Sequence, residues 1–491
     1  MKKQAFNPYL PLFEYVPDGE PYVFDGRVYI YGSHDLAGGD KYCPGNYVTW
    51  SAPVDDLGNW RYEGVIYKRT QDPSNREGKR ELWAPDIAKT PNGKYYLYYC
   101  FAFMPEIGVA VSDSPTGPFE FYGHVKYPAN LMGGKDLNEH LPFDPGVLVD
   151  DDGRVYLYYG FSPAGAMRAP DPDAAQELGL DPAEMEKLKN MQFSPGSMVV
   201  ELESDMVTMK GEPKVCLPGA KISQGTGFEG HAFFEASSMR KVRGNYYLIY
   251  SSQLSHELCY AVSRYPDRDF SFGGTIISNG DIGYRGNETP VAMMGNNHGS
   301  ILQIENEWYI FYHRQTHGTE ASRQGCAERI EVLPDGSIPQ VAMTSCGLNG
   351  GPLLGKGNYP AAIACHLTGS SDMSKINYGA SLQKVQPYIF EEKDSLSYIA
   401  NIKDGVIIGY KYFDFVDVTG IALKIRGSAT GIIAVRLGSP TGEPVGAEAI
   451  SLQENDWQSL VIPVKISNGV HALYFAYTGT GSLQFREFEL S

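Results

Sequence analysis

Five polar residues occupy one repeated position in the first 300 residues of the chain. They are Asp18 (PDGEP), Asp86 (WAPD), Asp144 (FDPG), Glu235 (FFEAS) and His298 (NNHGS), each seven to nine residues before a turn. Carboxyl groups that converge must share protons, bind a cation or do acid–base chemistry, because like charges repel. A single aspartate before proline or glycine is commonly only a turn residue. The coincidence across the set therefore favours a shared site over five separate turns.

The turns belong to a repeated pattern of short aromatic strands. Its copies are VFDGRVYIYGS (23–33), TPNGKYYLYYC (90–100), VDDDGRVYLYYG (149–160), KVRGNYYLIYS (241–251) and QIENEWYIFYH (303–313). Each is typical of a β-hairpin, and the turn residues Gly26, Gly93, Gly153, Gly244 and Asn306 are 67, 60, 91 and 62 residues apart. The repeat predicts an all-β fold with a five-bladed β-propeller over residues 1–350. Equivalent positions face the propeller axis, so the polar residues would converge in a central funnel.

Two other acidic stretches are interpreted as structural and not as catalytic or metal-binding. The run Asp150, Asp151 and Asp152 reads as a solvated turn, because a calcium loop of the EF-hand type needs a glutamate where Gly160 or Phe161 stands. Residues 170–191 are acidic and are expected to form an exposed helical insertion.

Composition excludes several classes of function. The chain has 491 residues, enough for two or three domains, and its net charge of −17 disfavours a nucleic-acid partner. No apolar run reaches the roughly 20 residues of a membrane span. The N-terminal MKKQAFNPYLP lacks the apolar core of a signal peptide, and the seven scattered cysteines predict neither disulfides nor zinc. A cytoplasmic location is the simplest expectation, or a secreted or periplasmic one if a leader has been removed. The 34 tyrosines suit β-strands and contacts with sugar rings.

The motifs resemble those of the family 43 glycoside hydrolases, five-bladed propellers that include xylosidases, arabinofuranosidases and arabinanases. The resemblance covers nearly all of the first 350 residues, in the family's order and spacing. PDGEPYVFDGRVYIYGSHD is similar to the segment that carries the general base, here Asp18. FDPGVLVDDDG resembles the segment whose aspartate, here Asp144, tunes the acid and orients the sugar. EASSMRKVRGNYYLIYS is similar to the segment led by the general acid, here Glu235.

The acid segment departs from the family pattern. Glu-Gly-Pro or Glu-Ala-Pro is usual, whereas this chain has Glu235-Ala236-Ser237. Glu229 in GFEGH is the alternative acid, but its distance from the following strand is six residues too long. The spacing favours Glu235.

The resemblance also implies residues that bind the substrate. Trp83 would form an aromatic wall beside the sugar, although a tryptophan of a blade core is equally consistent. Asp86 would contact the substrate from its repeat position. Arg323 and Arg314 each offer a guanidinium to sugar hydroxyls, with Arg323 preferred because it follows the last blade strand. His298 resembles an axial histidine that holds a calcium ion or a water, although a hydrogen-bonded core histidine is the commoner outcome.

The implied activity is inverting, exo-acting hydrolysis that releases terminal β-D-xylose or α-L-arabinofuranose from oligosaccharides or polysaccharides of plant hemicellulose. The sequence does not decide between the two pentoses, and it does not exclude endo-arabinanase activity. No cofactor is required, with calcium at the axis as the one candidate. The alternative is a non-catalytic sugar-binding propeller with a structural cation. A propeller glycosidase acting on fructosides or β-mannosides fits the motifs less well.

The C-terminal region has a different pattern. Residues 351–370 are glycine-rich and are interpreted as a linker. Residues 371–491 contain short alternating strands that suggest a jelly-roll β-sandwich. GYKYFDF, DWQSL and GVHALYFAYTGTGSLQFREFEL resemble a family 6 carbohydrate-binding module. Trp457 and Tyr410 would then bind glycan, or belong to the core of a structural domain.

Overall fold

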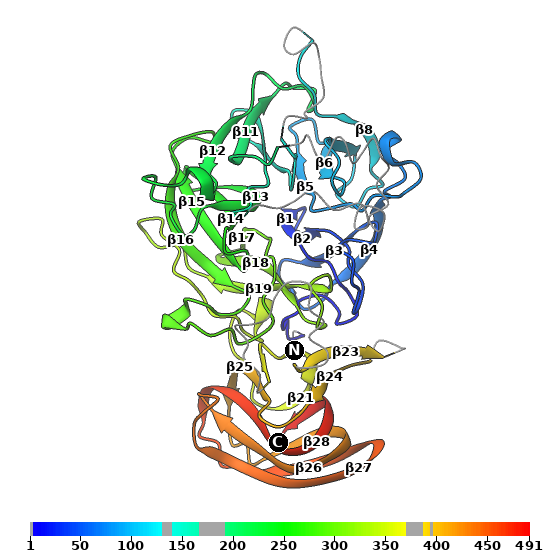
Figure 1. Cartoon of the computed structure of the whole chain (residues 1–491), viewed down its shortest axis with the longest axis vertical. Helices are drawn as coiled ribbons and strands as arrows, with labels where there is room; N and C mark the ends of the chain where they lie inside the picture. The colour runs from blue at the N-terminus through cyan, green and yellow to red at the C-terminus, as the bar shows by residue number, and fades with distance from the viewer. Residues whose placement is uncertain (1–2, 130–139, 166–191, 370–385, 393–395) are drawn as a thin grey trace.

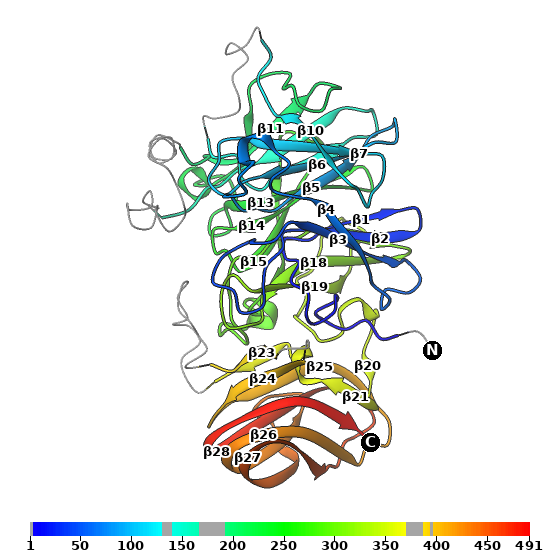
Figure 2. The same ribbon diagram turned by 90° about the vertical axis from the view of Figure 1, so that its right-hand side faces the viewer.

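The structure, a computed structural model, describes residues 3–129, 140–165, 192–369, 386–392 and 396–491. Its described elements are mostly β-strands, which form a propeller and a smaller curled sheet domain (Figure 1, Figure 2). The all-β prediction is confirmed. The helical insertion expected at 170–191 lies outside the described residues. Within the described ranges, no helix is long and apolar enough to cross a membrane.

Five antiparallel sheets form the blades. Blade 1 contains β1 (Glu20–Phe24), β2 (Arg27–Tyr31), β3 (Tyr47–Pro53) and β4 (Arg61–Tyr67). Blade 2 contains β5 (Asp86–Lys89), β6 (Tyr95–Cys100), β7 (Ile107–Ser112) and β8 (Glu120–His124). Blade 3 contains β9 (Gly146–Val149), β10 (Val155–Tyr159), β11 (Gly196–Leu202) and β12 (Lys214–Pro218). Blade 4 contains β13 (Phe233–Val242), β14 (Asn245–Ser252), β15 (Glu257–Ser263) and β16 (Ser271–Ser278), and blade 5 contains β17 (Ile301–Ile304), β18 (Glu307–Gln315) and β19 (Arg323–Ile330).

The predicted hairpins are the first two strands of each blade, and all five are confirmed. In blade 1, Phe24 pairs with Arg27 across a two-residue turn. Asp25 and Gly26 in that turn have φ angles of 48° and 75°. Positive φ at both central residues matches the twist of a tight hairpin. Local turn chemistry is therefore sufficient to set the register of this pair of strands.

The tyrosines of the repeat lie in the propeller core. All six residues of β6, YYLYYC, are buried. The Tyr98 hydroxyl donates to the Met206 carbonyl at 2.7 Å, and the Tyr158 hydroxyl donates to the Pro266 carbonyl at 2.8 Å. These rings bury apolar area while each hydroxyl finds a backbone acceptor. The repeat tyrosines therefore hold the blades together and do not form a sugar-binding face.

The N-terminal segment closes the ring of blades. The Asn7 side chain donates to the Ala327 carbonyl and accepts from the Ala327 amide, both at 2.9 Å. The Tyr9 amide donates to the Gly325 carbonyl at 3.1 Å. These bonds attach the start of the chain to β19, the last blade strand. Blade 1 is thereby held beside blade 5, which fixes the positions of residues facing the axis.

The C-terminal domain is one curled sheet. Its strands are β20 (Leu353–Leu354), β21 (Gly357–Pro360), β22 (His366–Thr368), β23 (Tyr388–Glu392), β24 (Leu396–Ile402), β25 (Ile407–Phe415), β26 (Gly420–Leu437), β27 (Pro444–Pro463) and β28 (Gly469–Leu490). The long β28 pairs with β21, β24, β25 and β26, so the sheet folds over a single apolar core.

Two expectations for this region are corrected. The glycine-rich stretch 351–370 is not a linker, because its strands β20 and β22 pair with β25 and its strand β21 pairs with β28. Tyr410 is fully buried in the core, with its hydroxyl donating to the Ala361 carbonyl, so it cannot bind glycan. Trp457 is partly exposed and has the Arg426 guanidinium 4.3 Å from its ring centroid. Glycan binding by this domain stays a prediction.

Direct contacts join the two domains. Lys411 Nζ of β25 lies 2.5 Å from the Asp281 carboxylate of the propeller. The Ile389 amide donates to the Thr316 carbonyl at 3.1 Å, and the Leu367 amide donates to the Val291 carbonyl at 2.7 Å. This ion pair and these two backbone hydrogen bonds attach the curled domain to the propeller.

Candidate active site

A cavity of about 650 Å³ lies where the five blades converge. Six of the eight residues predicted for the site line it: Asp18, Trp83, Asp144, Glu235, His298 and Arg323. The other two, Asp86 and Arg314, do not. The structure therefore brings together three of the four carboxyl residues that the repeat pointed to.

Unusual backbone conformations direct the carboxyl groups into this cavity. Asp18 and Asp144 each stand two residues before an inner strand, β1 or β9, and have φ angles of 57° and 46°. Glu235 lies in β13 where the pairing with β14 shifts register, and Ala236 beside it has a φ of 67°. Positive φ is costly for residues other than glycine, so surrounding contacts must enforce it. Such strain is characteristic of functional sites.

A close approach of blades 3 and 4 places two of the carboxyl residues side by side. A Cβ atom added to Gly146 would lie 2.1 Å from the Ser237 carbonyl oxygen. Only glycine allows this contact, two residues after Asp144 and two after Glu235. The FDPG motif therefore needs its glycine in order to position both carboxyl groups.

Asp18 is held in its ionised form. Its Oδ1 accepts a hydrogen bond from Arg323 Nη1 at 2.9 Å. Burial would raise the pKa of Asp18, but the Arg323 guanidinium, together with His313 and His298, outweighs burial and holds that pKa below its ordinary value. Burial lowers the pKa of His313, whose Nδ1 accepts from the Asp18 amide at 3.2 Å. A neutral His313 thus fixes the Asp18 backbone while Arg323 keeps its carboxylate charged.

Asp35 fixes the orientation of Arg323. Arg323 donates Nε to Asp35 Oδ2 at 2.8 Å and Nη2 to Asp35 Oδ1 at 3.1 Å, and both residues are buried. A bidentate pair locks the guanidinium plane, which aims the remaining nitrogen at Asp18. Sequence reasoning missed Asp35, although it ends the YGSHD part of the base motif.

Glu235 is in the opposite state to Asp18. Burial raises the pKa of Glu235 well above its ordinary value, and the neighbouring Asp144 carboxylate raises it further. Burial also raises the pKa of Asp144, but His298 Nδ1 lies 3.4 Å from Asp144 Oδ2 and opposes that shift. Glu235 has no such ion pair among the described residues. These surroundings favour a proton on Glu235 over one on Asp144.

His298 lies between two carboxylates. Its Nε2 is 3.6 Å from Glu20 Oε1, on the side away from Asp144. Burial alone would lower the pKa of His298, but Asp144 and Glu20 outweigh it and raise the pKa well above its ordinary value. Calcium takes six to eight oxygen ligands, yet no three His, Cys, Asp or Glu donors around His298 lie within 4.8 Å of one another in the described residues. Calcium binding at the axis stays a prediction, and the two carboxylates beside His298 favour its positively charged form.

Asp86 is displaced from the cavity by two residues. It is the first residue of β5, whereas Asp18 and Asp144 precede their strands, and Ala84 occupies the corresponding place at the cavity wall. Its carboxyl group accepts from the Tyr22 hydroxyl and from the Val147 amide, both at 2.7 Å. Burial, followed by the Glu20 carboxylate, raises the pKa of Asp86 to about 7. Asp86 joins blades 1, 2 and 3, and the expected substrate contact is corrected.

Glu20 occupies in β1 the position that Asp86 has in β5. It pairs with Arg240 of blade 4 at 2.5 Å, and the Ser238 hydroxyl donates to it at 2.9 Å. The Arg240 guanidinium lies 4.5 Å from the centroid of the Tyr22 ring. This ionic group joins blades 1 and 4 across the axis. Sequence reasoning missed it, although Glu20 stands two residues after Asp18 in PDGE.

Two further candidates lie elsewhere. Arg314 is buried at the junction with the C-terminal domain, where its Nη1 donates to the Ala364 carbonyl at 3.2 Å. Arg314 and Arg323 lie on neighbouring strands but face different cavities, so only Arg323 can reach a sugar in the propeller. Glu229 is exposed and accepts from the Gly225 amide, and it is not among the residues that line the cavity, whereas Glu235 is.

Aromatic rings form part of the cavity wall. The Trp83 ring lies 4.9 Å from Phe103 and 4.8 Å from Phe143, between centroids, and Phe143 lies 4.7 Å from Phe161. The polar side chains of Gln253 and Asn296 also line the cavity. Rings suit the apolar C–H face of a sugar and polar groups suit its hydroxyls. Trp83 therefore lines the cavity and is not confined to a blade core, and its contact with a sugar stays a prediction.

Comparison with known families decides what this site belongs to. The model of glycosyl hydrolases family 43 matches residues 17–338, which include Asp18, Asp144, Glu235 and all five blades. The chain belongs to this family. It is a glycoside hydrolase, and the matched region ends before the C-terminal domain begins.

Relatives and solved structures agree with this family assignment. A xylosidase/arabinosidase of Thermoclostridium stercorarium is 46% identical over 498 residues, covering 100% of this chain and 99% of the relative. A xylosidase/arabinosidase of Bacteroides ovatus is 32% identical over 322 residues, covering 62% of this chain and 87% of the relative. A solved family 43 enzyme from Xanthomonas citri, complexed with xylotriose, has 26% identity and a TM-score of 0.51, covering 71% of this chain and 96% of that one.

Proposed function

We propose that this glycoside hydrolase releases terminal pentoses, β-D-xylose or α-L-arabinofuranose, from hemicellulose oligosaccharides with inversion at the anomeric carbon. Relatives at 46% and 32% identity carry the name xylosidase/arabinosidase. The observation that carries the proposal is that Asp18 and Glu235 are buried in one cavity with opposite surroundings. Arg323 bonds to Asp18 and favours its charged form, whereas burial and Asp144 favour the protonated form of Glu235.

An inverting glycosidase needs one ionised and one protonated carboxyl group. Asp18 accepts a proton from water as the water attacks the anomeric carbon. Glu235 gives its proton to the departing glycosidic oxygen as the bond to the sugar breaks. The carboxyl groups must leave room for the water, at a separation of roughly 6.5–9.5 Å. Proton exchange with solvent then returns both groups to their starting states.

The neighbouring charges maintain this division of roles. Arg323, fixed by Asp35, favours the charged form of Asp18. The Asp144 carboxylate favours the protonated form of Glu235, because ionisation would place two negative charges together. Asp144 is also placed to accept a hydrogen bond from a sugar hydroxyl.

The dimensions of the cavity support action at a chain end. Its volume of about 650 Å³ lies within the range of pockets for small ligands, roughly 300–1,000 Å³. A pocket of this size suits a terminal sugar and its immediate neighbour better than a long stretch of polymer. The aromatic wall around Trp83 would pack against the sugar rings.

The alternative of a non-catalytic sugar-binding propeller is not supported. Binding alone does not require a carboxyl group held protonated beside one held ionised. Membership of family 43 also decides against a glycosidase of the fructoside or β-mannoside type.

Proton NMR of the first-formed product tests both the substrate and the stereochemistry. The wild-type chain should cleave xylobiose or a nitrophenyl pentoside, and a β-xyloside should yield α-xylose first. Prior appearance of β-xylose would indicate retention and contradict the roles of Asp18 and Glu235. Parallel assays with β-xylosides, α-L-arabinofuranosides and hexosides rank the substrates, and a preference for hexosides would overturn the pentose assignment.

A further inference from the structure

Arg314 carries an unpaired positive charge between the two domains. It lies on β18 with 4% of its surface exposed. Its Nη1 donates to the Ala364 carbonyl at 3.2 Å, and its Nε donates to Cys326 Sγ at 3.2 Å. Its Nη2 has no hydrogen-bond partner in the structure as described, and no described carboxylate pairs with it. Three nitrogens thus have only two neutral acceptors.

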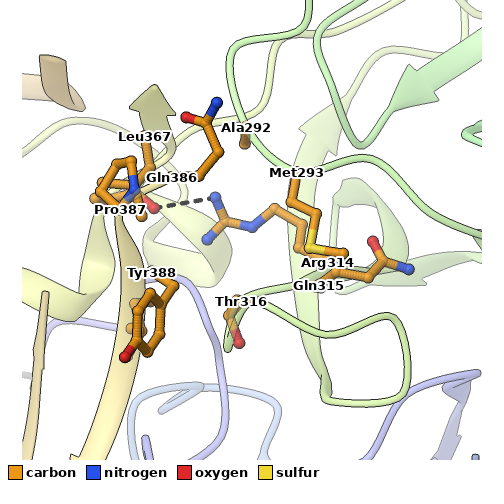
Figure 3. Close-up of a pocket in the computed structure, with 12 residues that line it drawn as sticks. Ala292, Met293, Arg314, Gln315, Thr316, Leu367, Gln386, Pro387 and Tyr388 are labelled. Carbon is orange, nitrogen blue, oxygen red and sulfur yellow. Dashed lines mark hydrogen bonds between the residues drawn. The ribbon is translucent and has the colours of Figure 1, made fainter. Parts of the chain in front are cut away.

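The free nitrogen faces a small cavity that both domains line. Figure 3 shows the guanidinium directed into the space between Met293 and Thr316 of the propeller and Pro387 and Tyr388 of the C-terminal domain. The cavity has a volume of about 30 Å³. The remaining lining consists of the apolar residues Ala292, Ala364, Leu367 and Ile389, together with Gly318, Gln315 and Gln386.

Among the described residues, no carboxylate forms an ion pair with Arg314. Glu328 is the described carboxyl group whose pKa Arg314 lowers, but burial outweighs that effect and raises the pKa to about 8. Glu328 is occupied by hydrogen bonds from Asn7, Tyr312 and Thr344. Burial disfavours the charged form of Glu328, and Glu328 makes no ion pair with Arg314 in the part of the chain that the structure describes, whereas arginine keeps its charge. A buried charge without a counter-charge is strongly unfavourable.

We propose that Arg314 binds a halide ion, chloride under ordinary conditions, in this cavity. A monatomic anion matches the volume, since a site for one water-sized particle needs only about 10–15 Å³. Phosphate and sulfate carry four oxygens and need more donors than the N–H groups of Nη2 can offer. The bound ion contacts side chains of both domains and stabilises their association.

Thermal unfolding of the full chain tests this site. The apparent Tm of the wild type should rise with chloride concentration when sodium gluconate is replaced by sodium chloride at constant ionic strength, because the ion binds only the folded junction. Arg314→Met removes the charge and should abolish the chloride dependence. Arg329→Met is the matched control, since Arg329 is an exposed arginine of the same sheet that pairs with Glu307. An equal Tm of the wild type in both salts would overturn the proposal.

A second measurement does not depend on any variant. Crystals of the wild type soaked in sodium bromide should show an anomalous peak in contact with Arg314 Nη2. A water, a side-chain carboxylate or no anomalous density at that place would overturn the proposal, whether or not Arg314→Met folds. Activity should be unaffected by halide, because the site lies outside the catalytic cavity.

Discussion

The central cavity and the interdomain cavity each hold a buried arginine, and the charges around the two differ. Arg323 has Asp18 and Asp35 as partners, at 2.9 and 2.8 Å. Within the described ranges, the partners of Arg314 are a carbonyl oxygen and a thiol. The first arrangement is electrically complete and favours the charged form of Asp18. The second is incomplete and requires a ligand from solution.

The difference shows that a buried arginine can have two effects. It can shift the pKa of a neighbouring carboxyl group, or it can favour an anion that helps to hold two domains together. In the propeller, burial amplifies every interaction between charges, which separates the pKa values of Asp18 and Glu235. At the junction, burial makes an unpaired charge costly, which favours a bound anion. Variants of each arginine and of its neighbours can therefore test the two regions separately.

The largest effect is expected from removing either catalytic carboxyl group. Asp18→Ala and Glu235→Ala should each lower kcat for xylobiose by about 10²–10⁴-fold, the usual contribution of a general acid or base. The loss in Glu235→Ala should shrink with a dinitrophenyl leaving group, which needs no proton, whereas the loss in Asp18→Ala should not. Asp151→Asn, on an exposed turn, is the control and should retain full activity. Near-normal turnover in either alanine variant would refute the assignment.

A matched pair of arginine variants should show the next largest effect. Arg323→Met leaves Asp18 and Asp35 without their counter-charge, and kcat/KM should fall by about 100-fold or more. The acidic limb of its pH profile should move to higher pH, because Asp18 then binds a proton more readily. Arg314→Met should keep kcat/KM within about twofold of the wild type, since it is remote from the cavity. Similar losses of kcat/KM in both variants would contradict the separate roles assigned to the two arginines.

Asp144→Asn should have a smaller and more specific effect. The negative charge of Asp144 raises the pKa of Glu235, so its removal lowers that pKa. Glu235 then loses its proton at a lower pH, and the alkaline limb of the pH profile of kcat/KM should move in the same direction. The acidic limb should move little. A fall in activity with both limbs unchanged would mean that Asp144 acts only by binding the sugar.

Local chemistry explains why the propeller could be predicted from the sequence. Each hairpin combines a tight turn, such as Asp25-Gly26, with an alternating aromatic strand, and five copies leave few other folds. The C-terminal domain offers no comparable repeat. Its strands of 18, 20 and 22 residues pair across the whole domain, and the glycines at 351–370 mark short strands of that sheet. Long-range pairing of this kind has no local signal.

The sequence predicted the positions of the repeated site residues to within about two residues along a strand. Asp18 and Asp144 lie at the cavity, as the repeat predicted. Asp86 instead has the position of Glu20, because each of these two residues is the first residue of its strand, β5 or β1. Conformation at a strand entrance decides this difference, and the motif WAPD does not encode it. The separate directions of Arg314 and Arg323 likewise depend on which face of a strand each residue occupies. Asp35 is recognised only when its bond to Arg323, 288 positions later, is seen.

The pH dependence of kcat/KM in the wild-type enzyme tests the central claim most directly, because its two limbs report the base and the acid of the free enzyme. Ordinary pKa values of 3.8 for Asp18 and 4.5 for Glu235 would leave almost no pH range with the base ionised and the acid protonated. The structure predicts a broad plateau, with the acidic limb below pH 3.8 and the alkaline limb well above pH 4.5. A narrow optimum near pH 4, or a broad plateau that persists unchanged in Glu235→Gln, would contradict the account.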